Sequence, residues 1–282
     1  MRTATKVAAP EVLQLEAERL NAVELQKIKP FPNFVVAAGK SEHWEKVLHR
    51  GELVVMLYAA KPVILKAIVP FPYDEFVWVL DGELTLSHVG GRTETYVAGD
   101  TLLVPKGFKG TWENRGDYRE LVVIETKAAE SAENPFKLAG SFLASLFRDK
   151  PEFLPLNAQQ LKSAELQPLE PTPADLELSD NLEAWRASSF NRVYGGEFVM
   201  EVYATKPGLL EFSAPFPCDK FVWVLDGELT LTHVDGQPAT YTAGDAVFVP
   251  KGFMGSWETR GNYRELAIIE AAAMAPSRGN RD

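Results

Sequence analysis

The sequence contains very little cysteine and histidine, and it has no surplus of positive charge. Among its 282 residues there are one cysteine, Cys218, and four histidines. A single thiol excludes an internal disulfide. Lys and Arg number 29 against 39 Asp and Glu, so the formal net charge is −10. Because no basic stripe is present to neutralise phosphates, we expect no nucleic-acid partner.

Long apolar stretches are also missing. No run of 18 apolar residues occurs, so no membrane-spanning segment is expected. The first ten residues hold two cations but no apolar core of a secretory signal. Hydrophobic residues make up 46% and charged residues 24% of the chain, as is usual for globular proteins. We therefore expect a cytoplasmic protein without a membrane partner.

The main positive feature is an internal duplication. Residues 71–125 recur at 216–270, and 38 of these 55 positions are identical. A weaker repeat precedes it, in which Leu13 matches Leu154 and Trp44 matches Trp185. The duplication predicts five parts: a loose arm at 1–11, a first domain at 12–126, a linker at 127–152, a second domain at 153–270, and a flexible tail at 271–282.

Within each copy, short segments rich in Val, Ile and aromatic residues alternate with turn signals. Asp81-Gly82, between apolar segments at 76–80 and 83–89, predicts a tight turn. Closely spaced short strands favour an antiparallel sandwich or barrel, and two copies favour two barrels. In the linker, apolar residues at helical spacing predict an amphipathic helix at about 134–148.

Two short motifs carry a family resemblance. Glu75 and Gly82 fit the end of the first cupin motif, and Gly99, Pro105-Lys106-Gly107 and Asn114 fit the second. The segment 107–113 resembles the ethanolamine-utilisation and ureidoglycine-aminohydrolase-like branch of this superfamily. The resemblance implies an all-β fold of two tandem jelly-roll barrels, each a double-stranded β-helix, with a short helical linker. Since cupins host many reactions, it does not define one.

The chain departs from the family at the metal-ligand positions. The family's three histidine positions fall on Val69, Phe71 and Gly110 in the first copy and on Ala214, Phe216 and Gly255 in the second. The carboxylate position is Glu75 in the first copy but Lys220 in the second. A cupin-type site needs imidazoles and a carboxylate converging on one ion. We therefore expect no bound metal and no cofactor.

Aromatic residues are candidates to line the barrel interiors. Because strand residues two apart share a face, Trp112 and Trp257 should point inward with Gly110 and Gly255. The indoles either fill the core or form a wall for a flat or apolar ligand. The other candidates for ligand contact are Tyr58, Phe71, Tyr203, Phe216 and Cys218.

The difference between the copies that says most about function is Glu75 in the first copy against Lys220 in the second. An isolated carboxylate in an apolar barrel would have a raised pKa and an isolated ammonium a lowered one, so either is a candidate proton shuttle. Lys220 is also a candidate for Schiff-base chemistry, and Cys218 for a thiolate beside a cation. The alternative is that these side chains lie solvated or paired at a barrel mouth.

Three functions remain open at this stage. The first is a metal-free bicupin that binds a small metabolite in a sensing, carrier or auxiliary role. The second is a lyase, isomerase or hydrolase of small molecules that uses Glu75 or Lys220. The third is a structural protein whose repeat faces serve oligomerisation. The expected partner is a small molecule, and either a monomer or a homodimer is compatible with two barrels in one chain.

Overall fold

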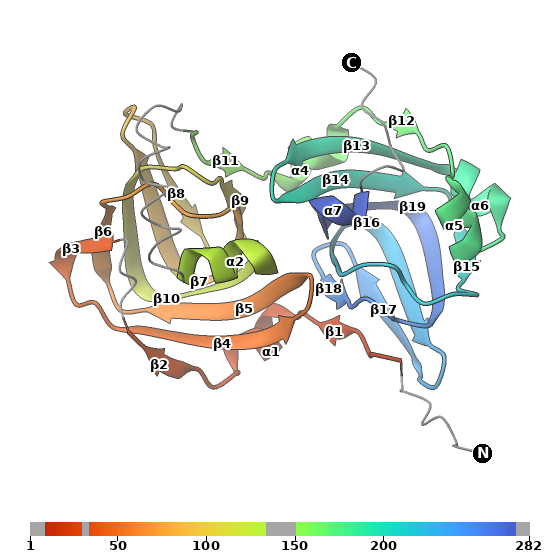
Figure 1. Ribbon diagram of the computed structural model, residues 1–282, viewed down its shortest axis with the longest axis horizontal. Coiled ribbons are helices and arrows are strands. Elements are labelled where there is room, and N and C mark those ends of the chain that lie inside the picture. Colours follow the sequence, from red (N-terminus) through yellow and green to blue (C-terminus); the bar gives the residue numbers. More distant parts are fainter. Residues whose placement is uncertain (1–8, 30–33, 134–150, 275–282) are drawn as a thin grey trace. The chain divides into compact units, whose positions relative to one another are not determined.

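The computed structural model describes residues 9–29, 34–133 and 151–274 and divides them into two units (Figure 1). The first barrel comprises Ala17–Gln160 and Gly196–Phe198. The second comprises the residues up to Glu16, Leu161–Gly195 and those from Val199 onward. The helix expected at 134–148 lies outside the described residues. No helix in these ranges is both long and apolar enough to cross a membrane.

The first barrel is built from antiparallel strands in the order β11-β9-β7-β10-β5-β4-β2, with β6 also on β10, β3 on β6, and β8 on β7. Its elements are α1 (Ala17–Asn21), β2 (Gln26–Ile28), β3 (Phe34–Gly39), β4 (His43–Arg50), β5 (Leu53–Ala60), β6 (Val63–Ala67), β7 (Glu75–His88), β8 (Thr93–Val97), β9 (Thr101–Val104), β10 (Gly110–Glu125), α2 (Thr126–Glu133) and β11 (Leu154–Pro155). α4 (Ala158–Ser163) crosses the boundary between the units.

The second barrel repeats this arrangement in the order β1-β18-β16-β19-β14-β13-β12, with β15 on β19 and β17 on β16. Its elements are β1 (Leu13–Gln14), β12 (Gln167–Pro168), α5 (Pro173–Leu178), α6 (Leu182–Arg186), β13 (Ser188–Gly195), β14 (Phe198–Thr205), β15 (Gly208–Glu211), β16 (Lys220–His233), β17 (Pro238–Thr242), β18 (Ala246–Val249), β19 (Gly255–Glu270) and α7 (Ala271–Met274). The all-β expectation is confirmed.

The tight turn predicted at Asp81-Gly82 is wrong, because β7 continues through it as one bent strand. Gly82 has φ +71°, and a Cβ there would lie 2.6 Å from the carbonyl oxygen of Arg115 on β10. The register between the two strands shifts at this point. A bulge bends a strand, so one half of β7 pairs with β9 and the other with β8. The bend lets one strand serve two faces of the barrel.

The first residues of each repeat pair with the other copy's unit. Leu13 on β1 pairs with Phe248 on β18, and Leu154 on β11 pairs with Leu103 on β9. The structural units therefore differ from the boundaries 12–126 and 153–270 expected from the duplication. The reason is burial: Leu15 is 1% exposed in the second barrel, and Phe153 is 1% exposed in the first.

Candidate functional site

The second barrel contains a cavity of about 230 Å³. Strands β14, β15, β16 and β19 and helices α5 and α6 contribute its walls. Six aromatic side chains line it: Trp185, Tyr203, Phe212, Phe216, Trp257 and Tyr263. Aromatic walls with a few polar groups are typical of small-molecule sites, because the rings bury apolar area while the polar groups orient the ligand.

The main polar feature of this cavity is an ion pair between Lys220 on β16 and Glu265 on β19. Lys220 Nζ lies 2.6 Å from Glu265 Oε1, and the side chains are 12% and 2% exposed. The Tyr263 hydroxyl donates a hydrogen bond to the other carboxylate oxygen. Burial and the Glu265 charge raise the pKa of Tyr263, so this hydroxyl stays protonated. Of the two alternatives for Lys220, an isolated ammonium and a solvated or paired one, the structure shows a paired ammonium.

Two aromatic rings flank the same ammonium. Lys220 Nζ lies 4.7 Å from the centroid of the Trp257 ring and 5.0 Å from that of Tyr203. These distances are within the range of cation–π attraction. Phe216 stacks on Trp257, with centroids 6.4 Å apart and an angle of 15° between the rings. The cavity thus offers one buried cation beside a stacked aromatic pair.

Helix α5 forms part of the wall of this cavity, and the first barrel has a different element in the corresponding part of its sequence. Thr172 caps the helix through a reciprocal capping box: its hydroxyl accepts from the Asp175 amide, and the Asp175 carboxylate accepts from the Thr172 amide. Pro173 starts the helix, where its missing N–H costs nothing. Thr172, Asp175 and Leu178 line the cavity. At the repeat offset of 141, residues 175–178 of this helix match residues 34–37, which belong to strand β3.

The structure brings together all the candidates from the second copy. Tyr203, Phe216, Cys218, Lys220 and Trp257 all line the cavity. Cys218 is 7% exposed, which places the chain's one thiol within the cavity wall rather than at a solvated mouth. These residues form a single environment, although they come from three strands and a loop.

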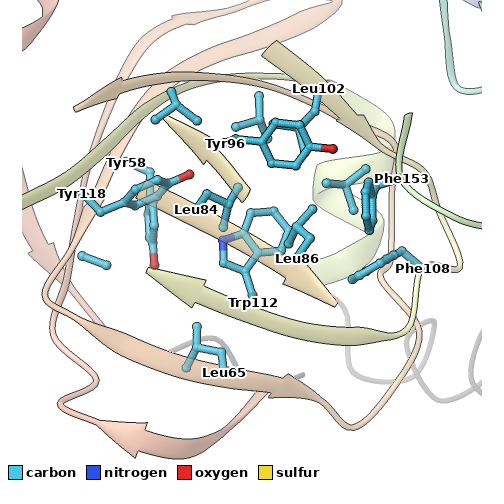
Figure 2. Close-up of a cluster of buried hydrophobic side chains, with 14 of the residues drawn as sticks. Tyr58, Leu65, Leu84, Leu86, Tyr96, Leu102, Phe108, Trp112, Tyr118 and Phe153 are labelled. Atoms are coloured by element: carbon cyan, nitrogen blue, oxygen red, sulfur yellow. The ribbon is translucent and has the colours of Figure 1, made fainter. Parts of the chain in front are cut away.

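The matching aromatic residues of the first copy lie in a buried cluster. Tyr58, Phe71 and Trp112 belong to one buried cluster, and Phe71 stacks on Trp112 with centroids 5.8 Å apart. Figure 2 shows Trp112 in the middle of the cluster, with Tyr58 and Tyr118 together on one side. Both indoles belong to buried clusters, and that of Trp257 also borders the cavity of the second barrel.

Glu75 shares the first barrel with a second buried carboxyl, Glu120, which was not among the residues predicted from the sequence. They are 6% and 2% exposed. Burial, followed by the charge of Glu120, raises the pKa of Glu75 well above its usual value. Burial also raises the pKa of Glu120 to about 8, although a hydrogen bond from Tyr118 opposes the rise. Glu75 thus fits neither of the two alternatives, a lone carboxylate or a solvated or ion-paired one: it is buried, and the charge of a second carboxyl acts on it.

A signal for Glu120 was present in the sequence. Tyr118 and Glu120 recur as Tyr263 and Glu265, and residues two apart on a strand share a face. A charged residue that repeats beside inward-facing aromatic residues is a candidate for a buried polar cluster. In the first barrel Tyr58 on β5 lies opposite Glu120 in the strand register and belongs to the same cluster.

His43 was also missed, and it extends this cluster. Its Nδ1 lies 2.6 Å from the Tyr58 hydroxyl and its Nε2 lies 2.7 Å from Ser41 Oγ. The side chain is 1% exposed, and burial lowers the pKa of the imidazole. The second copy has Ala184 at the matching position, so the repeat comparison alone gave no sign of a shared role.

The residues at the family's metal positions do not fit a metal ion. A Cβ at Gly110 would lie 2.0 Å from the Ser87 carbonyl oxygen, and one at Gly255 would lie 1.9 Å from that of Thr232. A histidine therefore has no room at either position while this backbone is kept. Phe71, at another of these positions, is an apolar ring that stacks on Trp112. No group of three or more His, Cys, Asp or Glu side chains suited to a metal occurs within the described residues.

Comparisons with known proteins agree with this architecture. The family model of the EutQ-like cupin domain matches residues 67–119 and 195–265. A protein of unknown function from Pseudomonas syringae pv. tomato aligns with a TM-score of 0.62 and 17% identity, covering 92% of this chain and 99% of that one. A cupin 2 conserved barrel domain protein from Leptotrichia buccalis gives a TM-score of 0.51 and 14% identity, covering 94% and 98%. Comparison with curated proteins gave no match.

Proposed function

Since this chain is a bicupin, with an EutQ-like cupin match in each barrel, we propose that its second barrel binds a small, largely apolar metabolite carrying a polar oxygen. The observation that supports this is the aromatic-walled cavity with the Lys220–Glu265 pair in its wall. Ligand pockets commonly hold about 300–1,000 Å³, so a cavity of about 230 Å³ suits a metabolite at the small end of the range.

The charged groups in the cavity wall limit which ligand groups can bind beside them. Lys220 has three N–H donors, of which Glu265 occupies one. A carbonyl, hydroxyl or carboxylate oxygen of the ligand can accept another. Because Glu265 already balances the lysine charge, an uncharged oxygen is accommodated without leaving a buried charge unpaired. The stacked rings of Phe216 and Trp257 offer a surface for a flat or apolar portion.

This proposal does not invoke a bound metal, because the residues at the family's metal positions do not form a donor set. The proposed role is that of a sensor, carrier or auxiliary binding protein. The ligand is expected to be a small molecule rather than a nucleic acid, given the net charge of −10.

Cys218 provides a direct test, because it is the chain's one cysteine and lines the cavity. A panel of small keto, hydroxy and aromatic acids would be screened for slower alkylation of this thiol by iodoacetamide, followed by mass spectrometry. We expect a binding compound to protect Cys218 at least tenfold. The control is Ala204→Phe, which fills the cavity from its wall. Protection that is unchanged in this variant would place binding elsewhere and overturn the proposal.

One observation favours a second candidate, a small-molecule enzyme that transfers protons. Lys220, Glu265 and Tyr263 all line the cavity and are joined by an ion pair and a hydrogen bond. Such a chain can donate or accept a proton at the ligand. A compound that protects Cys218 would be tested for turnover in the wild type and in Lys220→Met. Turnover that persists in the variant would exclude this role for Lys220.

A further inference from the structure

The duplication places two nearly identical environments around groups of opposite charge. In the second barrel, Glu265, Tyr263, Tyr203 and Trp257 surround the ammonium of Lys220. At the repeat offset of 145, the first barrel has Glu120, Tyr118, Tyr58 and Trp112. All four residue types are the same. The second barrel therefore shows which group this environment accommodates: a primary ammonium.

In the first barrel the lysine is replaced by Glu75. Tyr118 donates a hydrogen bond to Glu120 as Tyr263 does to Glu265. Both carboxyls are buried, and the charge of Glu120 contributes to the raised pKa of Glu75. Among the described residues, neither carboxyl forms an ion pair with a lysine, arginine or histidine. The first barrel thus has two buried carboxyls where the second barrel has one carboxyl and an ammonium, and the described residues supply no cation to them.

Asn114 is an independent sign of a ligand on the same inward face. It is 1% exposed, and neither its Nδ2 nor its Oδ1 has a hydrogen-bond partner among the described residues. A buried amide without a partner is costly, because the lost water contacts are not replaced. On β10 it lies two residues after Trp112 and so shares its face. Its counterpart Thr259 lines the cavity that contains Lys220.

We propose that the first barrel binds a small primary ammonium compound, with its ammonium group between Glu75 and Glu120. This group supplies three N–H donors. The two carboxylates accept two of them, and the Asn114 amide oxygen provides an uncharged acceptor for the third. The rings of Tyr58 and Trp112 flank the cation, as Tyr203 and Trp257 flank Lys220. This site is distinct from the cavity of the second barrel and goes beyond the function proposed for it.

The probe is methylammonium chloride, added to the full-length protein and followed by isothermal titration calorimetry and thermal unfolding. Sodium chloride and tetramethylammonium chloride at equal ionic strength are the controls, since neither ion donates an N–H. We expect saturable binding of methylammonium with a rise in the unfolding temperature, and at least tenfold weaker effects of both controls. A rise that sodium reproduces, or no saturable binding of methylammonium, would overturn the proposal.

The decisive variant is Glu75→Lys, which gives the first barrel the residue that the second barrel has at the matching position, Lys220. Its tethered ammonium should pair with Glu120, raise the unfolding temperature above that of Glu75→Gln, and reduce methylammonium binding at least tenfold. Failure of Glu75→Lys to fold would count against the proposal, because Lys220 is accommodated in the same surroundings. Glu75→Gln should weaken binding at least tenfold, whereas Glu83→Gln, on the same strand, should leave it unchanged. Unchanged affinity in Glu75→Gln would overturn the site.

Discussion

The ammonium of Lys220 lies 2.6 Å from the carboxylate of Glu265, at a position where the other barrel has two glutamates. The difference between Glu75 and Lys220 puts two like groups in the first barrel where the second has an ion pair, although the glutamate, the two tyrosines and the tryptophan around them are repeated. Because buried charges are costly without a partner, this difference controls the response of each barrel to pH and mutation.

Replacing Lys220 by Met should destabilise the second barrel by about 3–5 kcal/mol near neutral pH, because it leaves the buried Glu265 carboxylate without its cation. The double variant Lys220→Met/Glu265→Gln should recover much of that loss. Peptide-resolved hydrogen exchange would assign the change to the second barrel. Equal stability of the single and double variants would show that the unpaired carboxylate is not the cause.

The first barrel should lose stability as the pH rises. Glu120 has a folded-state pKa of about 8 against an ordinary value of 4.5, and that of Glu75 is also raised. The folded protein therefore binds more protons than the unfolded chain in this window. The stabilisation is fully present below about pH 4.5 and is lost as the pH passes through about 8.

Glu75→Gln tests this dependence, because it removes one of the two like charges. It should match the wild type at pH 5 and exceed its stability at pH 9 by about 1–3 kcal/mol. Urea unfolding at both pH values would measure the difference. Glu113→Gln is the control, since the exposed Glu113–Arg115 pair should contribute at most about 1 kcal/mol. A Glu75→Gln effect that does not grow with pH would contradict the shared-charge explanation.

The repeat-related tryptophans should respond differently to truncation. Trp112→Ala should destabilise the first barrel by about 3–5 kcal/mol, because it removes a large ring from a buried core cluster. Trp257→Ala should cost less, because that ring already borders a cavity. The two variants serve as controls for each other in hydrogen exchange of their own barrels. Equal losses would indicate that the first barrel is no better packed than the second.

Gly110 should tolerate no side chain, because an added Cβ would lie 2.0 Å from the Ser87 carbonyl oxygen. Gly110→Ala should therefore destabilise the first barrel by more than about 2 kcal/mol. Gly208→Ala is the control, since its Cβ would meet neighbouring atoms only at 3.7 Å. Thermal unfolding would compare the two. A mild Gly110→Ala phenotype would mean that the backbone at this position can shift to admit a ligand histidine.

The sequence by itself determined the class of fold, the duplication, and the positions where a metal-binding cupin would have its ligands. These follow from local patterns: strand alternation, turn residues and identity between copies. It also pointed to Glu75 and Lys220 as the informative difference. The turn predicted at Asp81-Gly82 failed because a glycine can bend a strand as well as end it, and only the facing strand decides between the two.

Only the tertiary structure decided what surrounds each candidate. Glu265 and His43 come from strands remote in sequence from Lys220 and Tyr58, so their contacts depend on the register between strands. The same holds for Glu120, which lies opposite Tyr58. Whether Trp112 and Trp257 fill a core or border a cavity depends on volumes contributed by several elements, including helix α5, which replaces a strand in the second barrel. Packing and charge pairing are properties of side chains brought together in space, and spacing along the chain does not contain them.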